Sequence, residues 1–312
     1  MLKDVRNFEA VHAVGSSTRP LVSVAIVTFN QKDFLIECIE SILSQDYPNF
    51  EIVIADDCST DGTQEAIRSY SEKYPGIFKF EFADKNQGIT TNSNAALFAC
   101  SGSYLAWMGG DDLMLPGKLT KQVAYMESNP ECAICYHDLD VFDSVSDKTL
   151  YLFSEKITPR EGNVEVLITN QSFNGACSCM VRKSKSPSNG FNKLIPFASD
   201  WLYWIETLHN GGTINYLNEV LGRYRRHGGN VTHASQKVAQ NDLDHLNTCN
   251  FLLALDPKYF SWAMIAYSSR LLNLRKKVTY FPAVMASMRL SFSLKGFICL
   301  SAYCLSLGYY KL

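Results

Sequence analysis

The chain has almost no net charge and therefore no excess of basic residues. Its 312 residues include 29 lysines and arginines and 31 aspartates and glutamates, a formal net charge of −2. Nucleic-acid-binding domains are usually strongly basic, so no nucleic-acid partner is expected. Hydrophobic residues make up 46% and charged residues 19% of the chain, which excludes an intrinsically disordered protein.

Two common phosphate-binding motifs are missing from the sequence. It contains neither a Walker loop, GxxxxGK[ST], nor a GxGxxG turn. A bound nucleotide would therefore not be held by the amides of a glycine-rich loop, and its phosphates would need another partner. The sequence also has no internal repeat and no low-complexity linker.

The N-terminal stretch lacks the long apolar run of a secretory signal. We therefore expect a cytoplasmic protein whose ten cysteines are reduced. Cys132 and Cys135 have metal-site spacing, but they fall in a predicted strand, where residues three apart point to opposite faces. Buried thiols are expected there rather than ligands. Cys177 and Cys179 would share one face of a later strand.

The first half of the chain alternates between the strand and helix periods. Continuous or alternating apolar runs predict strands at 21–28, 50–55, 78–82 and 104–108. Apolar residues three and four apart predict helices at 33–43, 62–74 and 90–100, the first of them capped by Asp33. This order predicts right-handed crossovers and a mainly parallel sheet flanked by helices.

The second half follows a different pattern. Strands are predicted at 132–142, 150–153 and 176–181, with one more ending near Arg226. A helix is predicted at 200–208, and the chain from about 236 is mostly helical.

Polar clusters follow three of the first four predicted strands. They are Thr28-Phe-Asn30, Asp56-Asp57 and the segment Gly109-Gly-Asp-Asp112. Ligands of parallel α/β sheets bind at the carboxyl ends of the strands, where these clusters would meet. Paired carboxylates beside glycines suit Mg²⁺ or Mn²⁺, although Gly-Gly-Asp-Asp is equally good turn chemistry.

Eight motifs in a fixed order resemble the inverting family 2 glycosyltransferases of the GT-A fold, over about residues 21–232. The motifs are VSVAIVTFN (22–30), SILSQDYP (41–48), EIVIADDCSTDGT (51–63), NQG (86–88), GDD (110–112), PGKL (116–119), SDW (199–201) and YRRH (224–227). The resemblance implies a Rossmann-like, mainly parallel α/β sheet with a helical C-terminal extension. It divides the chain into an N-terminal extension (1–20), a nucleotide-sugar half (21–130), an acceptor and catalytic half (131–235) and helices (236–312).

The resemblance also implies roles at the nucleotide and metal sites. Thr28, Asn30 and Asp57 would contact the nucleotide, with Asp57 accepting from the ring N–H of a uracil-like base. Asp111 would touch the ribose or a metal-bound water. Asp112 would bind Mn²⁺ or Mg²⁺ at the donor diphosphate, and His227 would assist the metal or the leaving group.

On the acceptor side, Asp200 matches the catalytic base, although an aspartate at a helix start is often only a cap. Arg225 and Arg226 are candidates for the acceptor or diphosphate, and Trp201 is a candidate for stacking on an acceptor sugar or else a core residue. One departure is Gly109, where many members carry an acidic residue, so the three-position Asp-x-Asp pattern is incomplete.

The implied activity is transfer of a sugar, with inversion, from a uridine diphosphate donor to a glycan or lipid-linked hydroxyl, in surface polysaccharide (O-antigen or capsule) synthesis. A divalent cation would neutralise the leaving diphosphate, and one carboxylate would take the proton of the attacking hydroxyl. Two alternatives stay open: a nucleotide-sugar-binding module without catalysis, and a nucleotidyltransferase. The latter usually has a basic, glycine-rich loop after the first strand, where this chain offers only Lys32.

The C-terminal segment 296–310 has no charged residue between Lys295 and Lys311. Its fifteen residues fall short of the roughly 20 that span a bilayer. A helix lying on an anionic membrane surface, through about 289–312, would have this pattern, as would a helix packed on the catalytic domain or on a second subunit.

Overall fold

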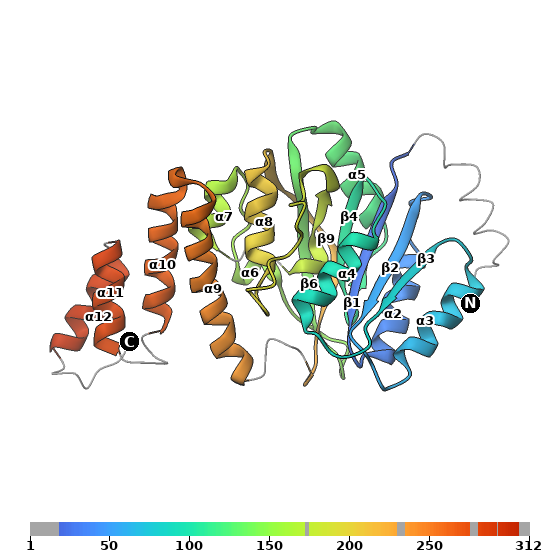
Figure 1. The fold of residues 1–312 in the computed structure, drawn as a ribbon, viewed down its shortest axis with the longest axis horizontal. Helices are drawn as coiled ribbons and strands as arrows, with labels where there is room; N and C mark the ends of the chain where they lie inside the picture. The colour runs from blue at the N-terminus through green and yellow to red at the C-terminus, as the bar shows by residue number, and fades with distance from the viewer. Residues whose placement is uncertain (1–18, 172–174, 230–234, 275–279, 292, 306–312) are drawn as a thin grey trace.

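A computed structural model describes residues 19–171, 175–229, 235–274, 280–291 and 293–305 (Figure 1). The strands are β1 (Val22–Thr28), β2 (Phe50–Asp56), β3 (Phe78–Phe82), β4 (Tyr104–Gly109), β5 (Leu113–Met114), β6 (Cys132–Asp143), β7 (Thr149–Leu152), β8 (Met180–Arg182) and β9 (Thr213–Arg226). The helices are α2 (Lys32–Leu43), α3 (Thr63–Lys73), α4 (Ile89–Ala99), α5 (Lys118–Ser128), α6 (Phe153–Lys156), α7 (Val164–Asn170), α8 (Asp200–His209), α9 (Ser235–Leu255), α10 (Phe260–Leu274), α11 (Tyr280–Leu290) and α12 (Leu294–Leu305).

The strands form one sheet in the order β3-β2-β1-β4-β8-β6-β9-β5, with β7 paired to β6. β3, β2, β1 and β4 are parallel neighbours, whereas the short β8 joins β4 to β6 in antiparallel fashion. The expected α/β sheet is confirmed, with a parallel first half and a mixed second half. Because β8 bridges the two, the halves 21–130 and 131–235 share one sheet.

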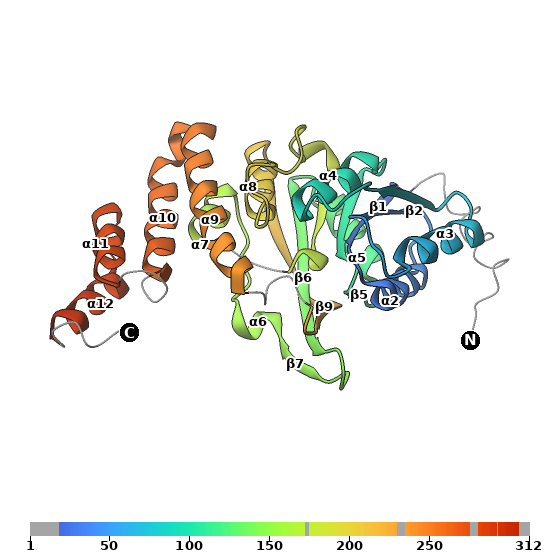
Figure 2. The ribbon, with the colours of Figure 1, turned by 60° about the horizontal axis from the view of Figure 1, so that its bottom comes forward.

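Helices cover both faces of the sheet, as Figure 2 shows. The core on one face joins α2, α3 and α5 to apolar side chains of β1, β2 and β4, among them Ile26, Ile54 and Met108. The core on the other face joins α4, α8, α9 and α10 to alternate residues such as Ala25, Val53 and Trp107. Since β1 and β2 bury both faces, they read as continuous apolar runs and not as alternating ones.

The C-terminal helices extend the molecule away from the sheet. α9 and α10 belong to the main core through residues such as Cys249, Leu252 and Ala263. α11 and α12 pack farther out, on a small separate cluster of Leu272, Val284 and Cys299 (Figure 1). Of the helices in the described ranges, none is long and apolar enough to cross a membrane.

Three local expectations are wrong. Asp33 is not the cap of α2, because Gln31 takes that position and Asp33 lies in the first turn. Residues 176–181 are not one strand, because a 3₁₀ turn (Ala176–Ser178) precedes β8 and carries Cys177.

Cys132 and Cys135 do not face opposite sides of the sheet. A register shift of β6 between Cys132 and Ile134 turns both thiols into the same core, where they form a hydrogen bond. The bulge cancels the alternation on which the expectation depended.

Candidate active site

The carboxyl ends of β2, β1 and β4 meet at one edge of the sheet. Thr28 pairs with Asp56, and Val27 pairs with Gly109. The loops after these strands are tied together as well, since the Asp57 amide donates to the Thr28 carbonyl at 3.1 Å and the Gly110 amide donates to the Val27 carbonyl at 2.9 Å. The expected convergence of three polar loops is therefore present.

Asp57 organises the loop that leads into α4. Its side chain is 4% exposed, and its two carboxylate oxygens accept from the amides of Gln87, at 2.7 Å, and Gly88, at 2.8 Å. A carboxylate oxygen can accept more than one hydrogen bond, so a nucleotide base can still be bound at this position. Contact with a base stays a prediction.

Asn30 joins two loops of the same edge. Its backbone has a φ of 52°, its amide donates to the Ser59 hydroxyl at 2.7 Å, and its side-chain oxygen accepts from the Thr60 amide at 2.8 Å. Asp61 makes a parallel connection by accepting from the Lys32 amide at 3.0 Å. Asn30 therefore shapes the loops, a role that the sequence did not indicate, and its contact with a nucleotide stays a prediction.

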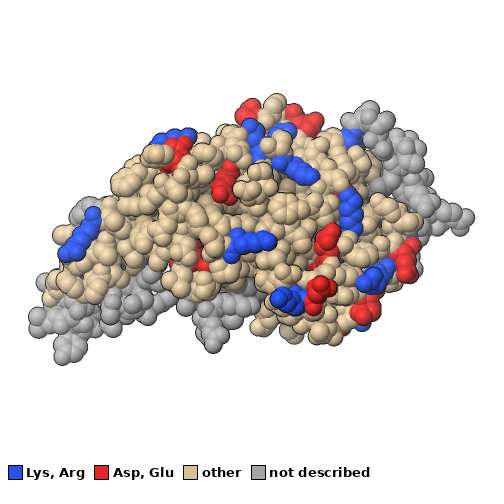
Figure 3. Space-filling model, in the orientation of Figure 1, with Lys and Arg blue, Asp and Glu red and all other residues tan. Residues whose placement is uncertain are grey.

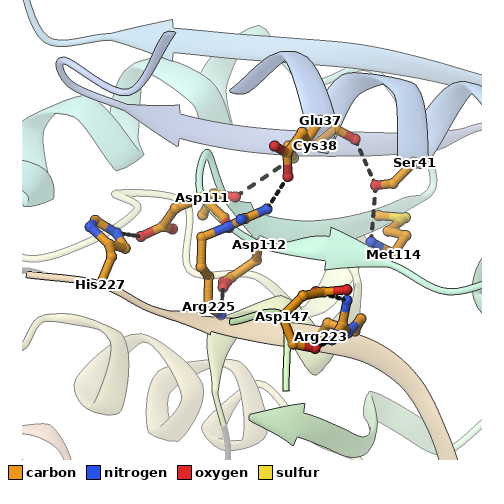
Figure 4. Close-up of polar contacts among 11 residues, drawn as sticks. Glu37, Cys38, Ser41, Asp111, Asp112, Met114, Asp147, Arg223, Arg225 and His227 are labelled. Atoms are coloured by element: carbon orange, nitrogen blue, oxygen red, sulfur yellow. Dashed lines mark hydrogen bonds and ion pairs between the residues drawn. The ribbon is translucent and has the colours of Figure 1, made fainter. Parts of the chain in front are cut away.

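Asp111 and Asp112 lie between the end of β4 and the end of β9 (Figure 4). Asp112 is 4% exposed, and its carboxylate accepts from the Arg225 amide at 3.0 Å. The Asp111 carboxylate lies 2.9 Å from Nε2 of His227. Residues more than 110 positions apart thus meet at the pair, which brings Asp111, Asp112 and His227 together as the resemblance implied.

The Arg225 side chain is buried between β9 and α2. It is 4% exposed, lies over the rings of Phe34 and Phe142 at 4.6 and 4.8 Å, and pairs with Glu37. Its Nε donates to the Asp111 carbonyl at 2.7 Å. Arg225 thereby fastens β9 to α2 and to the aspartate loop, and its contact with an acceptor or the diphosphate stays a prediction.

Arg226 points elsewhere, with its guanidinium 4.8 Å from the centre of the Tyr224 ring, and it is half-buried. Its candidacy for the acceptor or the diphosphate stays a prediction.

The aspartate pair is electrostatically crowded. Burial, and after it the negative charge of Asp111, raises the pKa of Asp112 well above its ordinary value. The Arg225 amide and the Cys177 thiol donate to Asp112 but do not reverse that shift. Two adjacent carboxylates held in this way are stabilised by a bound cation.

The Asp111 and Asp112 carboxylates fit a hard divalent cation that takes its remaining ligands from a substrate and from water. Across the described ranges, no three His, Cys, Asp or Glu side chains gather as ligands of one ion. Mg²⁺ and similar ions commonly take only one or two protein carboxylates and complete their shell with phosphate oxygens and water. Asp112 and Asp111 meet that smaller requirement.

A side chain at Gly109, where many family members carry an acidic residue, would crowd the aspartate pair. A Cβ at this position would stand 2.8 Å from an Asp111 oxygen and 3.1 Å from an Asp112 oxygen. The two carboxylates thus converge on the space that a side chain at position 109 would fill. A Cβ at Gly110 would stand 2.8 Å from the Thr28 hydroxyl, so this second glycine lets the loop close on β1.

Asp200 is the first residue of α8, and its carboxylate accepts from the Trp201 amide at 2.9 Å. The residue is exposed to solvent, yet the protein around it desolvates the carboxylate and raises its pKa. A raised pKa makes a carboxylate a stronger base, and exposure leaves it open to an acceptor hydroxyl. Both properties suit the predicted role.

Trp201 is a core residue. It is 3% exposed, its indole N–H donates to the Leu167 carbonyl at 2.9 Å, and its ring stacks on His245 with centroids 5.3 Å apart. The expectation that it stacks on an acceptor sugar is therefore corrected, because no face of the ring is open.

The α/β sheet with carboxylates at the ends of its parallel strands agrees with the glycosyltransferase class that the sequence motifs resemble. The model of glycosyl transferase family 2 matches residues 23–186, more than half of the chain, and the chain belongs to this family.

Among curated relatives, the putative teichuronic acid biosynthesis glycosyltransferase TuaG of Bacillus subtilis is 28% identical over 225 residues, which cover 71% of this chain and 85% of TuaG. The first relatives matched are uncharacterised mycobacterial proteins, of whose length the chain spans 61%.

Two solved structures share the fold. Residues 1–349 of S. aureus TarS, in complex with UDP-GlcNAc, match with a TM-score of 0.59 and 17% identity, over 93% of each chain. The mannosyltransferase PcManGT of Pyrobaculum calidifontis, in complex with GDP-Man and Mn²⁺, matches with a TM-score of 0.62 and 17% identity, over 98% of this chain and 87% of its own. The expected GT-A type of α/β fold is confirmed.

Proposed function

We propose that the protein transfers a sugar, with inversion, from a uridine diphosphate donor to a hydroxyl of a glycan or lipid-linked acceptor. The observation that carries the proposal is the edge at which Asp57, the Asp111–Asp112 pair and His227 are held by the ends of β2, β4 and β9. Family membership and the UDP-GlcNAc complex of TarS support a nucleotide-sugar donor.

The residues at this edge of the sheet have two separate tasks, binding the nucleoside and binding the cation. Thr28, Asn30 and Asp57 hold the nucleoside at the ends of β1 and β2. Asp112, assisted by Asp111 and His227, holds Mn²⁺ or Mg²⁺ against the donor diphosphate. When bound, the cation offsets the negative charge that grows on the leaving diphosphate. PcManGT supports this choice, since its structure contains Mn²⁺.

Asp200 takes the proton of the attacking acceptor hydroxyl. The acceptor oxygen then forms the new bond to the anomeric carbon while the bond to the diphosphate breaks on the opposite side. A single base with in-line attack inverts the anomeric centre, because no covalent sugar–enzyme intermediate intervenes. The name of TuaG, with its reference to teichuronic acid biosynthesis, supports a surface polysaccharide such as O-antigen or capsule as product.

The C-terminal end supports contact with an anionic membrane surface, where a lipid-linked acceptor would be found. From residue 257 to 312 the sequence has eight basic and no acidic residues: Lys258, Arg270, Arg275, Lys276, Lys277, Arg289, Lys295 and Lys311. Phe281, Phe297 and Ile298 of α11 and α12 are each at least 41% exposed. On the face drawn in Figure 3, the described surface over α11 and α12 shows basic but no acidic side chains. Residues 306–312 of the proposed contact lie outside the described residues.

The test is a panel of uridine and guanosine diphosphate sugars, assayed for nucleotide release with Mn²⁺, with Mg²⁺ and with a chelator. Release from a uridine donor that the chelator stops would support the proposal. Calorimetry with uridine diphosphate separates the alternatives, since tight binding without turnover of any donor would indicate an inactive binding module. Pelleting with vesicles of anionic and of neutral lipid tests the membrane contact.

A further inference from the structure

Helix α9 reaches back to the segment that carries Asp200. Asp244, fully buried on α9, accepts through one carboxylate oxygen from the amides of Phe197, at 2.8 Å, and Ala198, at 2.9 Å. Its other oxygen accepts from the Gln240 side chain at 2.7 Å. Two of the three donors to this carboxylate are therefore main-chain amides that lie three and two residues before Asp200.

These hydrogen bonds give the amides of Phe197 and Ala198 an acceptor, which they would otherwise lack. Amides just before a helix have no intrahelical partner, and a buried unpaired amide costs free energy. A buried carboxylate is likewise costly unless its oxygens accept hydrogen bonds. Asp244 and the two amides meet both needs at once, so the path of residues 197–198 is fixed from the side of α9.

The same segment is held from the opposite side by α4. The Thr90 hydroxyl donates to the Ile195 carbonyl at 2.8 Å and lies 2.8 Å from the Ser199 hydroxyl. His245, next to Asp244 on α9, stacks on Trp201. The residues before and after Asp200 in the sequence are therefore held by α4 or α9, at positions 195, 197, 198, 199 and 201. Asp200 itself is left exposed.

We infer that Asp244 is a positioning residue for Asp200: it holds the main chain of Phe197 and Ala198 so that the base stays in reach of the acceptor hydroxyl. The inference rests on the proposed role of Asp200. A base works only within hydrogen-bond distance of the proton that it removes, and a displacement of about 1 Å can reduce a rate on the order of 100-fold. Through this one side chain, helix α9 supports the segment that carries the base.

The test compares the full-length wild type with Asp244→Ala, Asp244→Asn and Leu252→Ala. Leu252 is a buried α9 residue that serves as the matched control, because its truncation loosens the packing of α9 without removing a bond to residues 197–198. Turnover of the donor found in the panel, affinity for uridine diphosphate with Mn²⁺, and hydrogen exchange of amides 197–201 are measured for each.

Asp244→Ala is expected to lower kcat about 10- to 100-fold, leave uridine diphosphate affinity within about twofold, and accelerate exchange at Phe197 and Ala198. Asp244→Asn is expected to recover part of kcat, because its amide oxygen can still accept from both backbone groups while Gln240 rotates. Leu252→Ala is expected to lower the melting temperature but keep kcat within about threefold.

Normal kcat in Asp244→Ala despite faster exchange would overturn the inference. So would equal losses of kcat in Asp244→Ala and Leu252→Ala, since general destabilisation would then account for both. Failure of the proposed function is a different observation: the wild type itself would turn over no donor in the panel.

Discussion

The two parts of the proposed active site, a donor side and a base side, are built in different ways. The donor side is made at the ends of adjacent parallel strands, where Asp57, Gly110 and Asp112 follow their strands within three residues and are joined to the strand ends by main-chain hydrogen bonds. The base side depends on one exposed carboxylate, Asp200, at the start of a helix that α4 and α9 hold from 46 to 109 residues away.

This difference separates binding from chemistry. A donor side fixed by the sheet should hold nucleotide and cation whether or not the helices around α8 are in order. A base side fixed by distant helices should lose activity with little change in nucleotide affinity. Single substitutions on each side can break that separation.

The largest effect is expected from Asp200→Asn. The amide cannot take a proton from the acceptor, so kcat for transfer should fall about 10²- to 10⁴-fold, the range typical of a positioned general base. Uridine diphosphate affinity should not change. Steady-state kinetics with an identified donor and acceptor, together with calorimetry, provide the measurements.

The matched donor-side variant is Asp57→Asn. It offers one carbonyl oxygen where two oxygens now accept from Gln87 and Gly88, so the loop should detach and nucleotide affinity should fall at least tenfold. If Asp200→Asn weakened nucleotide binding as much as Asp57→Asn does, the two sides would not be separable.

The difference between the two sides also decides what the sequence could predict. β1, β2 and β4 are buried on both faces and end in polar turns, so the strands and the meeting of Thr28, Asp57 and Asp112 follow from local pattern. The bulge that turns Cys132 and Cys135 to one side leaves no local sign, since it depends on how β6 pairs with β9.

The support of the base could not be predicted for the same reason. Asp244 lies in the middle of a helix whose apolar pattern looks ordinary, and its amide partners are 46 and 47 residues away. Trp201 was ambiguous because helical spacing puts an aromatic residue either in the core or at a site, and only the packing of α7 and α9 places it in the core. The position of the Arg225 side chain is similarly set by its contacts with Phe34 and Glu37 on α2, which the local sequence around Arg225 does not indicate.

Trp201→Ala is expected to have the largest effect on stability. Truncating a buried tryptophan typically costs about 3–5 kcal/mol, and this variant also removes the bond to the Leu167 carbonyl. Chemical denaturation should show that loss, and Trp201→Phe should recover part of it. An unchanged unfolding free energy combined with a raised KM for the acceptor would contradict the core assignment and restore the stacking role.

Asp112→Asn tests the cation on the donor side. In the absence of metal, the variant should be as stable as the wild type or more so, because it removes one of two crowded carboxylates. Ligand binding at about 100 times its dissociation constant adds roughly 2.7 kcal/mol. The rise in melting temperature that Mn²⁺ and uridine diphosphate give the wild type should therefore shrink markedly. A full rise in Asp112→Asn would move the metal site elsewhere.

The smallest effect is a pH dependence that should have opposite signs on the two sides. On α8, burial raises the pKa of Glu206 to about 7. Its stabilising contribution, present below the unfolded pKa of about 4.3, is lost as the pH rises through 7. Glu206→Gln does not ionise, so its melting temperature should rise relative to the wild type from pH 5 to pH 8, with a gain of roughly 1–2 kcal/mol at pH 8 after allowance for partial exposure.

On the donor side, burial pushes the pKa of Asp61 upward, but hydrogen bonds from Thr63 and the Lys32 amide outweigh it and lower that pKa. Its contribution is present above the unfolded pKa of about 3.9 and is lost as the pH falls through the lower folded value. Asp61→Asn should therefore destabilise the protein most near neutral pH and least near pH 3. Thermal melts of both variants across this range measure the two slopes. If the melting temperatures of the two variants, relative to the wild type, changed with pH in the same direction, the expected opposite signs would be wrong. Glu206 and Asp61 would then not distinguish the helix that carries the base from the loops of the donor side.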